Sequence, residues 1–372
     1  MDVASDTRRR LKRVGAFLVA FVVFEYVALP QLAGARHTLH LLGRVNVAWL
    51  VAGVVLEAAA IAAYAELTRT LLPPGDRPPR LNLIRITLST LGISHVVPGG
   101  TAVGSSVGYR LLTNEGVTGT DAGLVLATEG LGSAVVLNIL LWLGLVVSIP
   151  LRGFNPLYGT AAVLGALLLS AVGLTVVGLT KGEDRLAATV CRVAGRLPLV
   201  DGNQVASVLR RVATRLREIG ADEDVLRLSI GWAAANWLLD AASLWVFLAA
   251  FGYRAWPDGL IISYGLANVL AAIPLTPGGL GVVETVLTAS LVGFGADHGV
   301  AVLGVVTYRL VNFWLPIPLG ALSYVTLRAD QRPGGLREVA EEAEQAAPRA
   351  RQWARERGLQ LPQLPVRRAD QE

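Results

Sequence analysis

Long apolar runs recur along the chain and alternate with short polar stretches. Each run approaches or exceeds the roughly 20 residues that an α-helix needs to cross a bilayer. Strands are not required to explain any part of this pattern. It predicts six spanning helices, near residues 14–30, 45–70, 120–149, 157–179, 226–251 and 300–326.

Two further apolar stretches, 83–115 and 260–296, are interrupted by a Pro-Gly-Gly sequence. Each stretch is too long for one helix across a ~30 Å hydrocarbon core, but suits two half-length helices. Backbone that leaves the helix at membrane depth is tolerated only where protein buries it or a wet cavity adjoins it. The pattern therefore predicts two re-entrant helical hairpins, with their turns at the Pro-Gly-Gly sequences.

The distribution of basic residues selects the topology. With both hairpins re-entrant, the two termini and the loops 72–82 and 180–225 share one side, and 27 of the 33 basic residues lie there. Positive charge marks the cytoplasmic side, so both termini are expected in the cytoplasm. The hairpins then enter from opposite sides and point their tips at each other, as in inverted repeats. The predicted fold is all-α and polytopic.

Composition agrees with a membrane protein and excludes other classes. Hydrophobic residues make up 53% of the chain and charged residues only 16%, and the mean hydropathy is +0.53. The single cysteine, Cys191, excludes an intramolecular disulfide framework and a cysteine-based metal cluster. We find no nucleotide-binding motif and no histidine pair with metal-ligand spacing, so no cofactor or metal is expected. The basic charge is dispersed among loops, which does not suit nucleic-acid binding.

Four charged residues fall at predicted membrane depth, where each costs at least ~2.5–3.5 kcal/mol on insertion scales unless it is paired or wet. They are Arg110, Glu129, Glu284 and Arg309. One interpretation is that they bind a polar ligand, and the other is that they pair only with each other and hold the helices together. For Glu57 and Asp240, which also lie within predicted helices, the structural role is favoured.

The two hairpin turns add groups that suit an anion. The half-helices that follow the turns would direct unpaired backbone N–H groups at the midplane, and the natural ligand beside two arginines is a phosphate. Hydroxyl groups could contribute further donors. The candidate substrate-binding residues at the turns are Gly99, Gly100, Gly278, Gly279, Thr276 and Ser105. The repeat of Gly100, Gly104 and Gly108 is interpreted mainly as a stripe that lets another helix pack closely.

The remaining segments carry weaker signals. Residues 1–326 are predicted to form the membrane domain. Within it, the loop 180–225 contains an amphipathic, arginine-rich helix that suits either the anionic cytoplasmic leaflet or the surface of the membrane domain. The tail 327–372 has too few apolar residues for a domain and is expected to be helical or disordered.

Three motifs resemble one known family. They are Pro98-Gly99-Gly100 followed by Arg110-Leu-Leu112, then Pro274-x-x-Pro277-Gly278-Gly279-Leu-Gly281-x-x-Glu284, and Tyr308-Arg309-Leu-x-x-Phe313-Trp314-x-Pro316. They are similar to the lysylphosphatidylglycerol synthase/flippase transmembrane-domain family, over roughly residues 10–326. The resemblance implies the flippase half of the multiple peptide resistance factor, which moves aminoacylated phosphatidylglycerol between leaflets. A Glu-Arg pair common in the family stands here as Glu129-Gly130, and no aminoacyl-transferase domain is expected.

The sequence thus predicts a transporter of the inner (plasma) membrane, and not an enzyme. The expected substrate is a phosphate-bearing anionic lipid, either a phospholipid such as an aminoacyl-phospholipid or a polyprenyl-phosphate-type lipid that carries a glycan. The alternatives are a small-solute or ion permease with inverted repeats, a membrane lipid transferase or phosphatase, and a non-catalytic membrane partner of a glycosyltransferase. A homo-oligomer is left open.

Overall fold

The computed structural model describes residues 46–97, 100–152, 217–271 and 276–330, with isolated residues between 159 and 170 and at 211 and 214. The predicted all-helical fold is confirmed over these ranges, in which no strand occurs. The elements are α3 (Val47–Leu71), η3 (Pro74–Asp76), α4 (Arg80–Val96), α5 (Gly100–Asn114), α6 (Gly119–Arg152), α10 (Glu223–Ala250), α11 (Pro257–Ala271), η4 (Pro277–Gly279), α12 (Val282–Gly293), α13 (His298–Arg309), η5 (Leu310–Trp314) and α14 (Pro316–Asp330).

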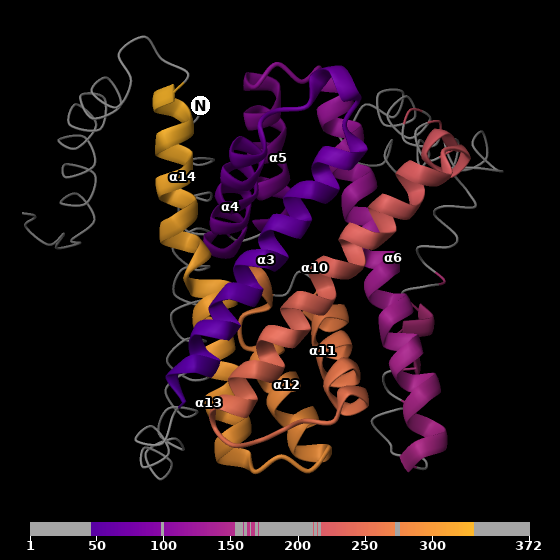
Figure 1. Cartoon of the computed structure of the whole chain (residues 1–372), viewed down its shortest axis with the longest axis vertical. Coiled ribbons are helices and arrows are strands. Elements are labelled where there is room, and N and C mark those ends of the chain that lie inside the picture. Colours follow the sequence, from indigo (N-terminus) through magenta and orange to yellow (C-terminus); the bar gives the residue numbers. More distant parts are fainter. Residues whose placement is uncertain are drawn as a thin grey trace, which may run out of the picture.

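Four helical segments in the described ranges are long and apolar enough to span a membrane. They are α3, α6, α10 and the continuous run α13–η5–α14, all of which extend along the long axis of the molecule (Figure 1). These confirm four of the predicted spans, and α14 continues to Asp330, beyond the predicted end at residue 326. The predicted span at 14–30 and the tail from residue 331 lie outside the described residues, as do most of the predicted span at 157–179 and most of the loop 180–225.

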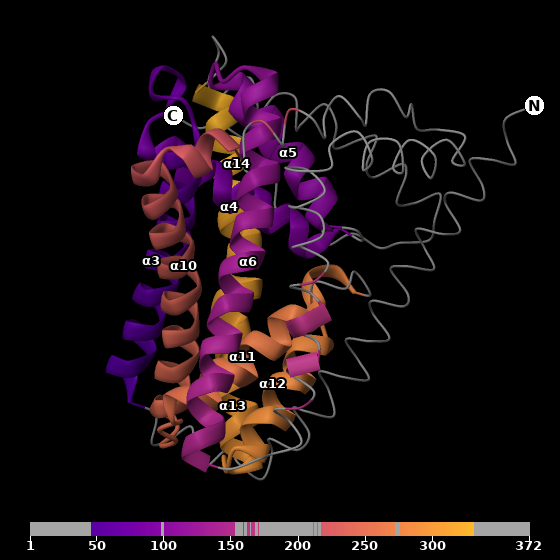
Figure 2. The ribbon, with the colours of Figure 1, turned by 90° about the vertical axis from the view of Figure 1, so that its right-hand side faces the viewer.

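Two helical hairpins occupy opposite ends of the molecule. The α4–α5 hairpin fills the half where α3 ends, and the α11–α12 hairpin fills the other half (Figures 1 and 2). Their helices have 17, 15, 15 and 12 residues, which at 1.5 Å per residue is about 18–26 Å each. Each helix is therefore shorter than a ~30 Å hydrocarbon core.

The glycine stripe of α5 packs against α4, as its spacing predicts. Gly100, Gly104 and Gly108 are all buried, and their nearest neighbours include atoms of Ser94 and Thr90. A Cβ at Gly100 would collide with the carbonyl group of Ser94. Only glycine there lets the two arms of this hairpin approach so closely.

The hydrophobic core has two parts, one for each hairpin. One part joins the middle of α6 and the second half of α10 to α11, α12 and α13, around the fully buried Phe247 and Tyr264. The other joins the end of α3 to α4, α5, the start of α6 and α14, around Leu83 and Leu112. The two parts meet at mid-height, where α3 and α10 pack together along their length (Figure 1).

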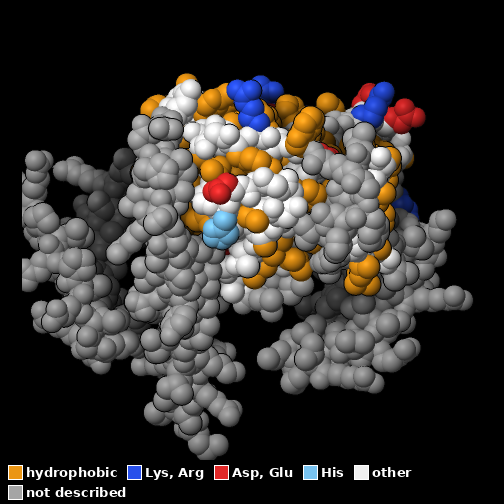
Figure 3. All heavy atoms as spheres, turned by 90° about the horizontal axis from the view of Figure 1, so that it is seen from below, with side chains coloured by type: hydrophobic (Ala, Val, Ile, Leu, Met, Phe, Trp, Pro, Cys, Tyr) orange, Lys and Arg blue, Asp and Glu red, His pale blue; other side chains and the backbone are white. Residues whose placement is uncertain are grey.

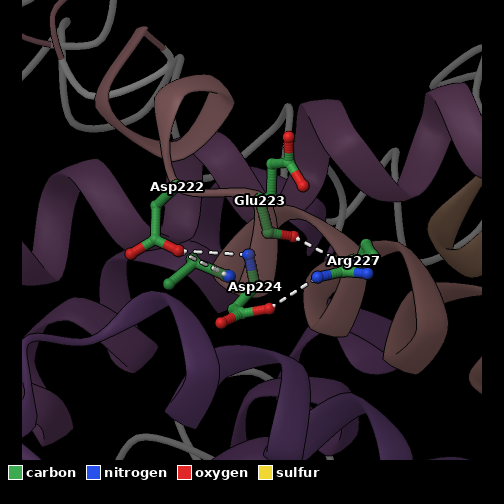
Figure 4. Close-up of polar contacts among 5 residues, drawn as sticks. Asp222, Glu223, Asp224 and Arg227 are labelled. Atoms are coloured by element: carbon green, nitrogen blue, oxygen red, sulfur yellow. Dashed lines mark hydrogen bonds and ion pairs between the residues drawn. The ribbon is translucent and has the colours of Figure 1, made fainter.

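Helix α10 begins at a polar N-cap. The Asp222 carboxylate accepts hydrogen bonds from the backbone N–H groups of Asp224 and Val225, each at 3.1 Å (Figure 4). Arg227 forms an ion pair with Asp224 at 2.8 Å and donates to the Glu223 carbonyl. Capping and acidic residues in the first turn both stabilise a helix N-terminus, so α10 starts here rather than extending further back.

Charge is distributed unequally between the two ends. Basic residues gather where α3 ends, α4 and α10 begin and α14 ends: Arg69, Arg77, Arg80, Arg85, Arg217, Arg227 and Arg328. At the opposite end the described ranges contain only Arg152, which ends α6, and Arg254, between α10 and α11. Figure 3 views that end, whose described surface is mostly apolar or uncharged.

Candidate functional site

The tips of the two hairpins meet near the middle of the molecule. His95, in the last turn of α4, stacks on the ring of Phe313 with 4.4 Å between ring centroids. Its Nδ1 donates to the Phe313 carbonyl at 2.9 Å. Gly278, in the η4 turn, has φ +56° and also lies against Phe313 and His95. A side chain at Gly278 would strain the backbone and collide with the Phe313 ring, which explains the glycine in this turn.

A buried ion pair lies beside this junction. Nε of Arg309 donates to Oε1 of Glu284 at 2.6 Å, and the two side chains are only 7% and 13% exposed. Nη2 of Arg309 also donates to the Gly278 carbonyl at 3.2 Å, and the guanidinium lies 4.4 Å from the centroid of Phe313. The arginine thereby joins α13 to the α11–α12 hairpin. We call Glu284 and Arg309 the tip ion pair.

Glu284 also closes the N-terminus of α12. Its Oε2 accepts a hydrogen bond from the Gly281 N–H at 2.6 Å, while Oε1 accepts from Arg309. The carboxylate therefore occupies the position where a helix N-terminus would bind an anion. An external phosphate could reach this position only if it displaced the Glu284 side chain.

A second polar cluster lies between the long helices, and we call it the carboxyl cluster. Asn312 uses one nitrogen, Nδ2, to donate to Glu57 at 2.7 Å and to Asp240 at 3.2 Å. Glu57 also accepts from the Ser243 hydroxyl at 2.9 Å, and Asp240 accepts from the Tyr264 hydroxyl at 2.6 Å. Glu57 and Asp240 are 5% and 8% exposed, so both carboxyl groups are enclosed by α3, α10, α11 and η5.

Both clusters depend on the π-helical turn η5. This turn bonds the N–H of Leu315 to the carbonyl of Leu310, five residues earlier. Pro316 has no N–H to give to the carbonyl of Asn312, and its ring crowds that carbonyl in a regular α-helix. The wider turn relieves this conflict, and π-helical turns of this kind often occur at functional sites. It places Asn312 at the carboxyl cluster and Phe313 at His95.

Glu129 lies apart from both clusters, between α6 and α3. It is 2% exposed and accepts a hydrogen bond from the Thr68 hydroxyl at 2.9 Å. No arginine is paired with it in the described ranges. The structure thus brings Glu284 and Arg309 together, but not Glu129 and Arg110.

The other predicted site residues are placed as follows. Arg110 and Ser105 are exposed on α5, and Arg110 lies ten residues, about 15 Å, along that helix from Gly100. Gly279 is buried beside Gly278 with φ +68°. The Thr276 hydroxyl is buried and has no hydrogen-bond partner in the described part of the chain. Gly99 lies outside the described residues.

The carboxyl cluster was not among the residues predicted for the site. The sequence shows Glu57 and Asp240 within apolar helices, but nothing in it joins them to Asn312. A usable signal exists: an asparagine four residues before a proline within an apolar run marks a polar group near a break in the helix.

Comparison with known proteins identifies the family. The model of the family described as "Lysylphosphatidylglycerol synthase TM region" matches residues 14–320, which is most of the 372-residue chain. The chain belongs to this family. The matched region of the lysylphosphatidylglycerol synthase family includes both hairpins, the tip ion pair and the carboxyl cluster.

Two of the similar proteins are named as membrane proteins. A UPF0104 membrane protein of Methanothermobacter thermautotrophicus is 23% identical over 334 residues, which cover 83% of this chain and 94% of the relative. The inner membrane protein YbhN of Escherichia coli is 25% identical over 100 residues, which cover 27% of this chain and 30% of the relative. Together with the apolar spans, membership of the lysylphosphatidylglycerol synthase family makes this a multi-pass membrane protein.

Proposed function

We propose that this protein is a flippase-like lipid translocase, which moves an anionic, phosphate-bearing lipid between the leaflets of the inner membrane. The single observation that carries the proposal is the tip ion pair. It lies where the tips of the two hairpins meet, and Arg309 also binds the non-helical backbone at Gly278. Family membership supports it, because the resemblance to the multiple peptide resistance factor implies translocation of aminoacylated phosphatidylglycerol.

The proposal includes a topology. The α4–α5 and α11–α12 hairpins are re-entrant and related as inverted repeats, and the arginine-rich end faces the cytoplasm together with both termini. Two features support this arrangement: hairpin helices shorter than the hydrocarbon core, and the strong excess of arginine at one end. In this topology the tip ion pair lies near the midplane of the bilayer.

In the proposed mechanism, Arg309 exchanges its partner. A guanidinium binds phosphate as well as carboxylate through paired N–H donors, so a lipid phosphate can take the place of Glu284. When Glu284 turns away, the N–H groups at the start of α12 also become free to bind the anion. The released carboxylate can receive the amino group of an aminoacyl lipid, while the acyl chains stay in the bilayer.

Other predicted residues have supporting roles in this proposal. Arg110 on the arginine-rich half of the molecule would meet the phosphate before or after it passes the tips. The backbone at Gly99 and Gly100, with Ser105, would line the path on that side. Gly278, Gly279 and Thr276 would line it at the opposite tip, and the buried Thr276 hydroxyl, which lacks a described partner, could donate to the phosphate.

The proposal is tested by reconstituting the purified protein in liposomes that contain a fluorescent lipid in both leaflets. A membrane-impermeant reductant then measures how fast inner-leaflet lipid reaches the outside. We expect transfer of labelled phosphatidylglycerol or lysyl-phosphatidylglycerol, slow transfer of labelled phosphatidylcholine, and loss of transfer in Arg309→Gln. Labelled polyprenyl phosphate in the same assay decides between the two lipid classes.

The alternatives give different results in the same preparation. A solute or ion permease would take up small solutes while lipids stay in place. A lipid-modifying enzyme would convert the labelled lipid into a new product in detergent. A non-catalytic partner of a glycosyltransferase would do neither, and any of these three outcomes would replace the proposal.

A further inference from the structure

The carboxyl cluster presents two acidic side chains to one neutral donor. Oε1 of Glu57 and Oδ1 of Asp240 both lie within hydrogen-bond distance of the same Asn312 nitrogen. Their distances to it are 2.7 and 3.2 Å, so the two carboxyl groups lie side by side. Ionised carboxylates only accept hydrogen bonds, and two like charges this close in an enclosed site favour a proton on one of them. The geometry therefore suits an acid beside its conjugate base.

Within the described ranges, no basic side chain bonds to these carboxyl groups. Their hydrogen-bond donors are the neutral side chains of Ser243, Asn312 and Tyr264. Arg309 lies three residues before Asn312, but its Nε is bonded to Glu284. Two negative charges enclosed together cannot both persist without compensation. A bound proton supplies that compensation.

The other titratable groups nearby face elsewhere. On α6, Glu129 is bonded to Thr68, which lies further along α3 than Glu57. On α4, His95 is bonded to the carbonyl of Phe313. On α12, Glu284 is bonded to Arg309 and Gly281. The groups that face the pair are thus Tyr264 from α11 and Tyr308 and Arg309 from α13.

We propose that Glu57 and Asp240 form a proton-binding site, and that gain or loss of this proton is coupled to the tip ion pair through the η5 turn. Asn312 lies three residues after Arg309 and next to Phe313, on which both Arg309 and His95 pack. Protonation changes which carboxyl oxygens can accept from Asn312, and so changes the restraint on this turn. A shift of the π-helical turn would move Arg309 relative to Glu284.

The proposed proton-binding site does not depend on the proposed function, whereas its coupling to the tip ion pair rests on the proposed lipid translocation. Such coupling would give the translocase an energy source, since a proton gradient across the membrane could then drive the lipid in one direction. No nucleotide is needed for such a cycle. The tip ion pair would open in one protonation state and close in the other.

Infrared spectroscopy of the wild-type protein in lipid nanodiscs tests the proton-binding part without any transport. We expect the C=O stretch of a protonated carboxylic acid at neutral pH, which shifts in heavy water and on carboxyl-¹³C labelling of aspartate or glutamate. Glu57→Gln and Asp240→Asn should each remove or shift this band. The variants are made in a Glu129→Gln background, which removes another buried carboxyl group, and in that background Glu66→Gln, whose carboxylate pairs with Arg80, is the control that should leave the band in place. Absence of such a band from the wild-type protein overturns the proposal, whether or not the variants fold.

Transport in a pH gradient tests the coupling part. In liposomes that contain labelled phosphatidylglycerol, we expect an imposed gradient to change the wild-type transfer rate several-fold. The same gradient should leave the rate of Glu57→Gln or Asp240→Asn unchanged. A wild-type rate that ignores the gradient overturns the coupling but not the proton site. Absence of lipid transfer in every condition overturns the proposed function, and the infrared band still decides whether the proton site exists.

Discussion

The ion pair between Glu284 and Arg309 holds the tip of the α11–α12 hairpin against the α13–η5–α14 span. The carboxylate accepts from Arg309 Nε at 2.6 Å and from the Gly281 N–H at 2.6 Å, and Arg309 in turn donates to the Gly278 carbonyl. Both ends of the short backbone break, at Gly278 and Gly281, are therefore fixed by one ion pair. This pair is also the only salt bridge in the described ranges whose two side chains are both largely buried.

The first prediction concerns neutralisation of this pair. Arg309→Gln leaves Glu284 buried without a cation, and Glu284→Gln leaves Arg309 without an anion, so each should cost ~3–5 kcal/mol of stability. The double variant should recover most of that loss but still fail to transfer lipid, because the phosphate ligand is gone. Thermal unfolding in detergent and the liposome assay measure the two effects. A double variant that transfers lipid normally would reduce the pair to a structural role.

The second prediction concerns the turn at Gly278. Alanine there must take φ +56° and would collide with the Phe313 ring, so we expect a loss of about 1–2 kcal/mol from the backbone alone. Gly231→Ala is the matched control, because Gly231 is exposed within α10 and a Cβ there meets no atom within 4 Å. That change should stabilise the helix by roughly 0.5–1 kcal/mol. Equal melting temperatures for the two variants would contradict the described turn.

The spans and hairpins could be predicted because length, hydropathy and Pro-Gly-Gly breaks are local properties of the sequence. The start of α10 is equally local, since Asp222 and the residues after it supply the cap. Partners across the fold are not local. Asn312 is 255 residues from Glu57 and 72 from Asp240, and only the way the helices pack brings the three together.

The positions of the charged residues along the chain did not predict which of them form ion pairs in the structure. Glu284 and Arg309 do meet, because α12 and α13 are neighbouring antiparallel helices with a short connection. Arg110 and Glu129 are closer in sequence, 19 residues apart against 25, but Arg110 is exposed on α5 while Glu129 faces α3. The rotation of a helix about its axis decides this difference. That rotation is fixed by packing, here by the glycine stripe of α5 against α4, and a hydropathy pattern does not contain it.

The third prediction separates two roles for Glu129. If it mainly holds α6 against α3, Glu129→Gln should change stability by about 1 kcal/mol or less, because the amide oxygen still accepts from Thr68. Glu129→Leu should cost roughly 1–3 kcal/mol, since it leaves the buried Thr68 hydroxyl without this acceptor. Lipid transfer should follow stability in both variants. A Glu129→Gln protein that folds but no longer transfers lipid would instead show that Glu129 takes part in substrate binding.

The last prediction tests the orientation in the membrane. With Cys191→Ser as the background, Gly75→Cys probes the loop between α3 and α4, and His298→Cys probes the start of α13. Both positions are exposed, and a Cβ at Gly75 meets no atom within 4 Å, so neither change should disturb the fold. Because the excess of arginine marks the cytoplasmic end, a membrane-impermeant maleimide should label position 298 in intact cells and position 75 only after permeabilisation. Labelling of both positions in intact cells would place the loop after α3 and the start of α13 on the same side, whereas the structure has them at opposite ends of the molecule (Figure 1). Reversed labelling would keep the spans but invert the molecule, and the arginine-rich end would then face outward.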